Sequence, residues 1–153
     1  MRASFPSVPM MLAATLALGF AGTPAVAGEA GGAKLAATLS GASEVDAQGV
    51  AGKGDPDGAG SFAGRLIPGK QQLCYTLTWS GIDVPTMAHI HSGAAGKNGP
   101  VFVPLTELGA GEHCIAIDKT KAADLVAKPA DFYVNVHNAA YPAGAARGQL
   151  ARK

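Results

Sequence analysis

The stretch LCYTLTWS, residues 73–80, has the most regular alternation of apolar and polar side chains in the chain. Successive side chains of a β-strand point to opposite faces, so Leu73, Tyr75, Leu77 and Trp79 share one face. The cysteine, the threonines and the serine share the other face. The stretch therefore predicts a strand of an antiparallel sheet, with one face packed against a core.

Similar short stretches lie on both sides of it, separated by turns that contain glycine and proline. One short helix is predicted at residues 118–127, because Asp118 can cap its start and Pro129 prevents its continuation. The polar, glycine-rich residues 41–60 are expected to form a surface loop. The predicted strands cover residues 34–40, 61–67, 73–79, 87–91, 101–105, 113–117, 132–137 and 148–151. This pattern favours an all-β fold, an antiparallel immunoglobulin-like or superoxide-dismutase-like β-sandwich of about seven to eight strands.

The first 27 residues have the features of an export signal. Arg2 supplies a positive charge, residues 10–21 form an apolar run, and Ala25-Val26-Ala27 has the small-x-small pattern of a cleavage site. The run is too short to cross a bilayer, which needs about 20 residues. We therefore expect cleavage after Ala27, a single domain over residues 28–153 with no membrane span, and export to the periplasm or the extracellular medium.

The charge balance argues against two classes of partner. The signal carries Arg2 and no acid, so its removal brings the 12 basic residues down to 11, equal to the 11 acidic ones. A neutral chain has no basic surface for nucleic acid and no polybasic patch for a membrane. The expected partners are an extracytoplasmic protein or a metal ion.

The two cysteines, Cys74 and Cys114, both lie in the exported part of the chain. An even number of cysteines in an oxidising compartment predicts a disulfide. This bond would close a loop of about 40 residues and would stabilise the fold by about 4 kcal/mol in the chain-entropy model. Two buried thiols are the alternative, and the spacing does not match the C-x-x-C arrangement of a redox-active pair.

Three of the four histidines lie in two predicted strands. His89 and His91 project to one face of the first, and His137 shares a face of the second with Asn135. If the strands are neighbours, three imidazoles meet on one surface and suit Cu(II) or Zn(II). Asn135, the Asp131 carboxylate and backbone carbonyls are then candidates for fixing the imidazole tautomers.

The same histidines have a structural interpretation. Imidazoles beside glycine-rich loops commonly bond to loop carbonyls, which here would order residues 93–100 and 138–144. Arg147 near the C-terminus is expected to pair with a carboxylate or with carbonyl groups, the alternative being recognition of an anion. Catalytic residues are not predicted, because the sequence contains no G-x-S-x-G, no H-E-x-x-H and no phosphate-binding loop.

At these residues the chain resembles the CHRD domain family, which takes its name from chordin. The matching phrases are LSGASEV at 39–45, LCYTLT at 73–78, AHIH at 88–91, GAAG at 93–96, GPV at 99–101, YVNVH at 133–137, YP at 141–142 and RGQL at 147–150. The resemblance implies a secreted, all-β domain of largely uncharacterised function, as a single-domain bacterial member. The family's usual proline-rich phrase after Val45 is replaced by Asp46-Ala47-Gln48.

Two functions of similar proteins are not expected of this chain. The cysteine-rich modules that accompany the domain in chordin-like animal proteins are missing from this sequence, so growth-factor binding does not carry over. A looser likeness to copper–zinc superoxide dismutase lacks that family's fuller histidine set, so dismutase activity is not supported.

These observations favour a secreted, non-catalytic binding module that holds Cu or Zn through His89, His91 and His137. The first alternative is a structural or protein-interaction module in which the histidines only order loops. A copper-dependent redox enzyme is the third and least favoured interpretation, because it needs an open coordination position and substrate access.

Overall fold

The computed structural model describes Met1 and residues 32–153. The predicted signal, residues 1–27, lies almost wholly outside the described residues, so its cleavage remains a prediction. Within the described part, no helix is both long and apolar enough to cross a membrane.

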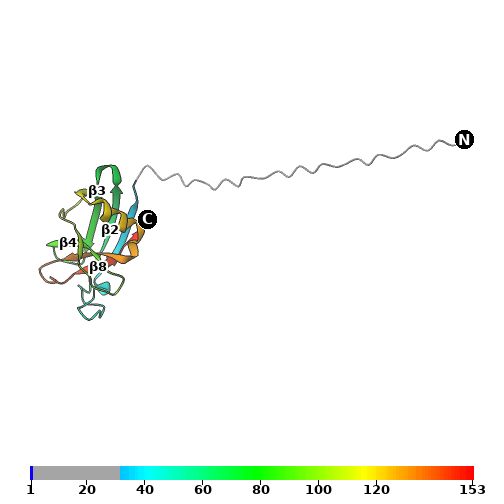
Figure 1. Cartoon of the computed structure of the whole chain (residues 1–153). Helices are drawn as coiled ribbons and strands as arrows, with labels where there is room; N and C mark the ends of the chain where they lie inside the picture. Colours follow the sequence, from blue (N-terminus) through cyan, green and yellow to red (C-terminus); the bar gives the residue numbers. More distant parts are fainter. Residues whose placement is uncertain (2–31) are drawn as a thin grey trace.

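Residues 32–153 form nine strands, one α-helix and three short 3-10 turns (Figure 1). The elements are β1 (Lys34–Ser40), η1 (Gly41–Ser43), β2 (Ala59–Ile67), η2 (Pro68–Lys70), β3 (Gln72–Ser80), β4 (Met87–Ser92), β5 (Val101–Pro104), β6 (His113–Ala116), α1 (Lys119–Ala127), η3 (Pro129–Asp131), β7 (Phe132–His137), β8 (Ala146–Gln149) and β9 (Ala151–Arg152). The predicted all-β class with one short helix is confirmed. The predicted last strand is divided into β8 and β9 at Leu150, which brings the number of strands to nine.

All strands belong to one continuous antiparallel sheet in the order β5-β4-β7-β8-β1-β2-β3-β6, with β9 also paired to β1. The expected sandwich is thus formed by a single sheet that curls around its own core. Strand β1 pairs with both parts of the divided last strand: Ser40 lies opposite Arg147 of β8, and Leu35 and Ala36 lie opposite β9.

The alternation of β3 is realised as predicted. Leu73, Tyr75 and Leu77 are buried in the core, and Trp79 packs against its edge. On the other face, Cys74 lies opposite Cys114 of β6, and the two form the predicted disulfide. Strand β3 is therefore held by apolar packing on its inner face and by a disulfide to its neighbour β6 on its other face.

Helix α1 begins and ends where the sequence predicts. The Asp118 carboxylate accepts hydrogen bonds from the backbone N–H groups of Thr120 and Lys121, at 2.7 and 3.4 Å. Leu125 is fully buried and docks the helix on the sheet. Figure 1 shows the helix in gold close to the C-terminus, where Arg152 bonds to a carbonyl of its last turn.

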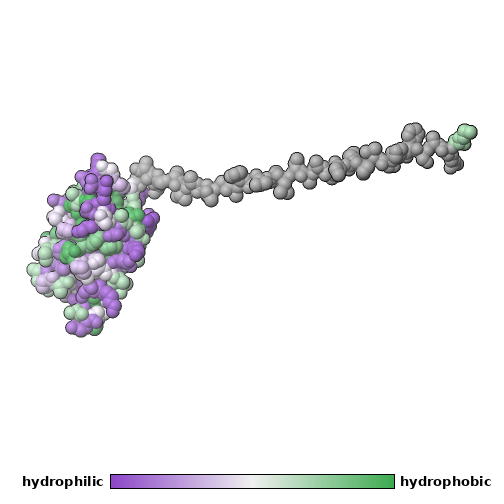
Figure 2. All heavy atoms as spheres, viewed as in Figure 1, coloured by the Kyte–Doolittle hydropathy of each residue, from purple (hydrophilic) through white to green (hydrophobic). Residues whose placement is uncertain are grey.

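The segment between β1 and β2 differs from the expected surface loop. Residues 46–53 are mostly exposed, and both hydrophilic and hydrophobic residues lie at this lower end of the molecule in Figure 2. Glu44 and Val45, however, are buried at 3% and 6% exposure. The start of the segment folds back against the sheet, where it covers the strands that carry the histidines.

Candidate metal centre

Strands β4 and β7 are antiparallel neighbours, which fulfils the condition that the histidine hypothesis required. His89 lies opposite Asn135, His91 opposite Tyr133, and His137 opposite Met87. The three imidazoles therefore project from the same face of the sheet. Their ring centroids are 5.5 Å apart for His89 and His91, 5.1 Å for His89 and His137, and 6.4 Å for His91 and His137.

Each of two rings is held by a loop carbonyl through its Nδ1 atom. His91 Nδ1 lies 2.9 Å from the carbonyl oxygen of Gly99, and His137 Nδ1 lies 3.0 Å from that of Pro142. A carbonyl only accepts hydrogen bonds, so Nδ1 carries the proton in both rings. In the neutral form, Nε2 then presents a lone pair, as metal-bound histidines do when a carbonyl fixes the other nitrogen.

The remaining nitrogens converge. His137 Nε2 lies 3.2 Å from His89 Nδ1, and one potential ligand atom from each of the three rings lies within 4.8 Å of the others. Ligand bonds of 2.0–2.1 Å at a tetrahedral angle place two nitrogens about 3.3 Å apart. The pair of His89 and His137 is already near that distance.

His91 Nε2 is buried and has no hydrogen-bond partner among the described residues. A buried polar atom without a partner costs about 1–3 kcal/mol, and a metal ion would remove that cost. The Nε2 atom of the fourth histidine, His113, is also buried and unpartnered, but its ring packs near Tyr75, 6.2 Å between centroids. The described residues place no other imidazole beside it, so only the three-histidine cluster combines an unpartnered nitrogen with neighbouring ligands.

Burial affects the protonation of two members of the cluster. Desolvation lowers the pKa of His89 below 6.5, and the charges of His137 and His91 act in the same direction. Desolvation also lowers the pKa of His91, against the smaller opposing effect of the bond to Gly99. Both rings are therefore neutral at pH 7, the state in which imidazole binds a metal.

A ring stack supports His91 from the side. The Tyr133 ring lies parallel to the His91 ring, with centroids 4.9 Å apart and an interplanar angle of 4°. The Arg147 guanidinium carbon lies 3.5 Å from the Tyr133 centroid, a cation–π contact. The Tyr133 hydroxyl accepts a hydrogen bond from the Gly99 N–H at 3.3 Å, so the stack is linked to the loop that holds His91.

Arg147 is buried and pairs with a carboxylate and with a loop, as the structural interpretation of this residue expects. Its Nη1 atom lies 3.4 Å from Glu44 Oε1 and 2.8 Å from Asn98 Oδ1, and its Nη2 atom donates to the Lys97 carbonyl. The side chains of Arg147 and Glu44 are only 2% and 4% exposed. This buried ion pair ties the segment after β1 and the loop before β5 to β8.

The two residues named as candidates for orienting the histidines have other contacts. Asn135 Nδ2 donates to Glu44 Oε2, so its amide is bonded to the ion pair and not to an imidazole. The contact that Asp131 makes near this face is through its backbone carbonyl, which accepts from the Gly93 N–H at 2.7 Å. The atoms that orient two of the imidazoles belong to the third kind of candidate, the backbone carbonyls, here those of Gly99 and Pro142.

Glu44 is the residue that sequence reasoning missed. It lies 91 positions from Asn135 and 103 from Arg147, so no local pattern connects it with the site. Its one signal was its place in the phrase LSGASEV.

A cavity of about 370 Å³ lies beside the cluster and is large enough for water or a small ligand. It is lined by Glu44, Val45, Asp46, Ala47, His91, Asn98, Gly99, Tyr133, Asn135, His137 and Ala143.

The described residues contain one other group with metal-ligating atoms, Cys74, Glu112 and Cys114. Its two sulfurs are bonded to each other, so they are not thiolate ligands. Among the described residues, the histidine cluster is therefore the remaining candidate for a metal site.

The comparison with protein-family models matches residues 35–150 to the CHRD domain. The chain belongs to the CHRD domain family. No curated protein and no solved structure gave a match to it. The CHRD match extends from β1 through β8, so it includes all three histidines, both cysteines and the pair of Glu44 and Arg147.

Proposed function

We propose that this CHRD domain is a non-catalytic binding module that holds a transition metal ion, copper or zinc, through His89, His91 and His137. The observation that carries the proposal is the arrangement of three nitrogens on one face of β4 and β7, all within 4.8 Å of one another. One of them, His91 Nε2, is buried without a partner. Borderline-soft imidazole nitrogens suit Cu(II) and Zn(II) better than Mg(II) or Ca(II).

The hydrogen bonds of the rings support the same proposal. Two loop carbonyls hold His91 and His137 by their Nδ1 atoms, at 2.9 and 3.0 Å. The rings are therefore oriented before any ion binds, and little side-chain freedom is lost on binding. The cavity beside His91 and His137 leaves room for a water molecule or a small ligand as a further donor.

Metal uptake by the purified chain tests the proposal. After dialysis against a chelator and then against Cu(II) or Zn(II) at pH 7.5, we expect about one bound ion per chain. His91→Ala removes a ligand and should weaken binding at least 100-fold. His113→Ala is the matched control, because that histidine lies on β6 away from the cluster, and it should bind as the wild type does. No uptake by the wild type, or equal loss in both variants, would contradict the proposal.

The number of bound nitrogens gives a second measurement. The electron paramagnetic resonance spectrum of the Cu(II) form should show hyperfine coupling to three imidazole nitrogens. His137→Ala should reduce this number to two. An unchanged spectrum would mean that copper is bound elsewhere on the chain.

A second candidate function is supported by the bonds to the loop carbonyls themselves. His91 and His137 link β4 and β7 to Gly99 and Pro142, as expected of a structural or protein-interaction module whose histidines only order loops. In that case His137→Ala should lower the melting temperature by the same amount with a chelator and with added metal. In the metal-binding case, added metal should raise the melting temperature of the wild type and not of the variant.

We also propose that the domain works outside the cytoplasm, in the periplasm or the extracellular medium. The disulfide between Cys74 and Cys114 supports this, since such bonds persist in oxidising compartments. The apolar run at residues 10–21 and the Ala25-Val26-Ala27 phrase support cleavage after Ala27. The mass of the exported protein should correspond to residues 28–153 with two hydrogens fewer than the dithiol form. The full-length mass in the cytoplasmic fraction would contradict it.

A further inference from the structure

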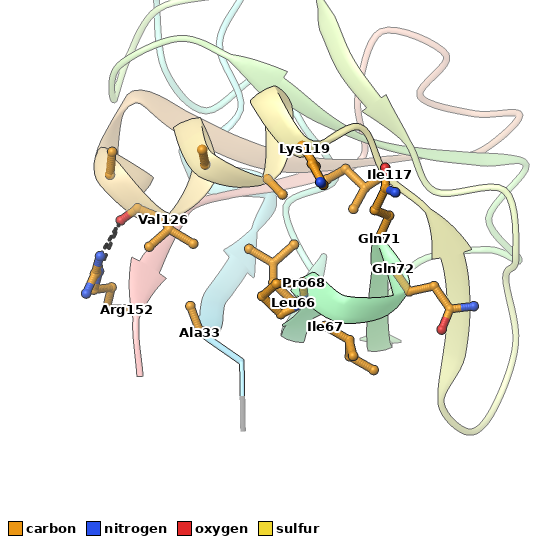
Figure 3. A pocket seen from close by; sticks show the side chains of 13 residues that line it. Ala33, Leu66, Ile67, Pro68, Gln71, Gln72, Ile117, Lys119, Val126 and Arg152 are labelled. Carbon is orange, nitrogen blue, oxygen red and sulfur yellow. Dashed lines mark hydrogen bonds between the residues drawn. The ribbon is translucent and has the colours of Figure 1, made fainter. Parts of the chain in front are cut away.

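A second cavity, unrelated to the histidines, lies beneath helix α1. Its volume is about 670 Å³, within the range of sites that bind small molecules. Figure 3 shows α1 above the cavity, the turn at Leu66, Ile67 and Pro68 below it, and Ala33, the residue before β1, to one side. The side chains that line it are mostly aliphatic.

The cavity exists because the helix presents small side chains to it. The lining residues of α1 are Lys119, Ala122, Ala123, Val126 and Ala127. Their spacing of three and four residues places them on one face of the helix. Three of the five are alanines, which do not reach across to the opposing turn, whereas Leu125 on the adjoining face is fully buried and holds the helix on the sheet. The helix is thus fixed in place with a hollow beside it.

The charges around this hollow are all of one sign. Lys119 and Arg152 are the two ionisable residues among the thirteen that line it, and none is acidic. Neither forms an ion pair with a described carboxylate. Arg152 donates to the Val126 carbonyl through Nε and Nη2, at 3.1 and 2.7 Å, which fixes its guanidinium at the end of α1 (Figure 3). Lys119 stands at the start of the same helix, near Ile117 and Gln71.

We propose that this cavity binds a free fatty acid, with the aliphatic chain lying under α1 and the carboxylate at Lys119. An apolar lining with a cationic rim is complementary to a molecule with one aliphatic chain and one negative head. Burial of the aliphatic chain supplies the affinity, about a fourfold gain for each CH₂ removed from water. The exposed Lys119 ammonium supplies a smaller, salt-sensitive contribution that selects the sign of the head group.

Calorimetric titration of the purified chain with dodecanoate, below its micellar concentration at pH 8, tests the proposal. We expect saturable binding of one molecule. Ala122→Leu fills the hollow and should weaken binding at least tenfold, and Ala123→Leu, at a more exposed position of the same face, should act in the same direction. Thr120→Leu adds the same side chain to a helix position that does not line the cavity, and it should leave binding unchanged.

The head group is tested separately. Dodecyltrimethylammonium, which has the same chain and the opposite charge, should bind much more weakly than dodecanoate. Lys119→Gln should weaken dodecanoate binding about threefold, in line with one exposed ion pair. Lys119→Arg should restore it. Equal binding of the two amphiphiles, or no effect of either alanine substitution, would overturn the proposal.

Two other occupants would give different results. A dimer in solution that Ala122→Leu dissociates, without dodecanoate binding, would assign the hollow to a second copy of the chain. Sedimentation with phosphatidylglycerol vesicles, without dodecanoate binding, would assign it to a membrane surface. Either result overturns the proposal. His91→Ala should leave dodecanoate binding unchanged, so failure here is distinguishable from failure of the metal site.

Discussion

Strand β7 is buried on both faces, and the two faces are buried in different ways. On the inner face, Phe132, Val134 and Val136 belong to the apolar core enclosed by the curled sheet. On the outer face, Tyr133, Asn135 and His137 are almost as deeply buried, at 3%, 3% and 7% exposure. Loops that bring polar groups cover the outer face, whereas strands that bring aliphatic ones cover the inner face.

The two faces of the strand differ in what they can contribute to stability and to function. Apolar contacts are non-directional, so the inner face tolerates changes that keep its volume and its hydrophobicity. On the outer face each donor requires an acceptor, and the bonds to Glu44, Gly99 and Pro142 fix where each side chain points. The outer face can therefore orient ligand atoms, which the inner face cannot do.

The largest expected effect comes from breaking the ion pair of the outer face. Glu44→Gln keeps the shape of the side chain but leaves the buried Arg147 charge without its carboxylate counter-charge, which should lower the free energy of unfolding by about 3–5 kcal/mol. Urea denaturation measures the loss. Glu112→Gln is the matched control, since it removes the exposed pair with Arg65 and should cost less than about 1 kcal/mol.

A double variant sharpens the same comparison. Replacing Arg147 by Met as well as Glu44 by Gln removes the uncompensated charge and should recover a large part of the lost stability. If Glu44→Gln lowers the free energy of unfolding no more than Glu112→Gln does, the buried ion pair does not stabilise the outer face. The proposed difference between the two faces would then be wrong.

A smaller effect is expected from the inner face of the neighbouring strand β4. Ile90 is fully buried between His89 and His91, with its side chain pointing the other way. Ile90→Val should cost about 1 kcal/mol of unfolding free energy, the usual cost of one buried methylene. It should leave Cu(II) and Zn(II) affinity unchanged in the uptake experiment. A tenfold loss of affinity would show that the two faces are not independent.

Sequence alone predicted what depends on local periodicity. The alternation at residues 73–80 and 132–137 was sufficient to assign faces, because side-chain direction in a strand follows from position in the sequence. The limits of α1 followed from Asp118 and Pro129, and the disulfide followed from cysteine parity. The histidine face of β4 was likewise predicted from the spacing of His89 and His91.

Features that depend on distant contacts could not be predicted in this way. The burial of Glu44 arises from partners 91 and 103 positions away, and its surroundings in the sequence are polar and glycine-rich. The alternation of β7 indicated that one face is polar, but not that loops cover it. Whether the sheet closes as two layers or as one curled sheet depends on the pairings of β1 with β8 and β9, which leave no local signal.

Removing one hydroxyl from the outer face should have an effect below that of Ile90→Val. Tyr133→Phe keeps the stack on His91 and the contact with Arg147 but deletes the acceptor of the Gly99 N–H. We expect a loss of about 0.5–1 kcal/mol in thermal or urea unfolding. Metal affinity should decrease only slightly, because the Gly99 carbonyl still holds His91. An affinity loss as large as that of His91→Ala would mean that the hydroxyl itself orients the ligand.

The smallest effect on stability is expected from pH. Burial holds the pKa of His89 and of His91 below the 6.5 of an exposed imidazole, so the unfolded chain takes up protons at a higher pH than the folded chain does. The free energy of unfolding should therefore be constant above pH 7 and fall as the pH is lowered from 6.5 through the pKa values of the folded state. His91→Gln should flatten this dependence. If metal binds as proposed, saturating Zn(II) should make the decline steeper, since protons and the ion then compete for the same nitrogens. If Zn(II) leaves the decline unaltered, the ion binds elsewhere, and the polar groups of the outer face serve stability alone, as the apolar groups of the inner face do.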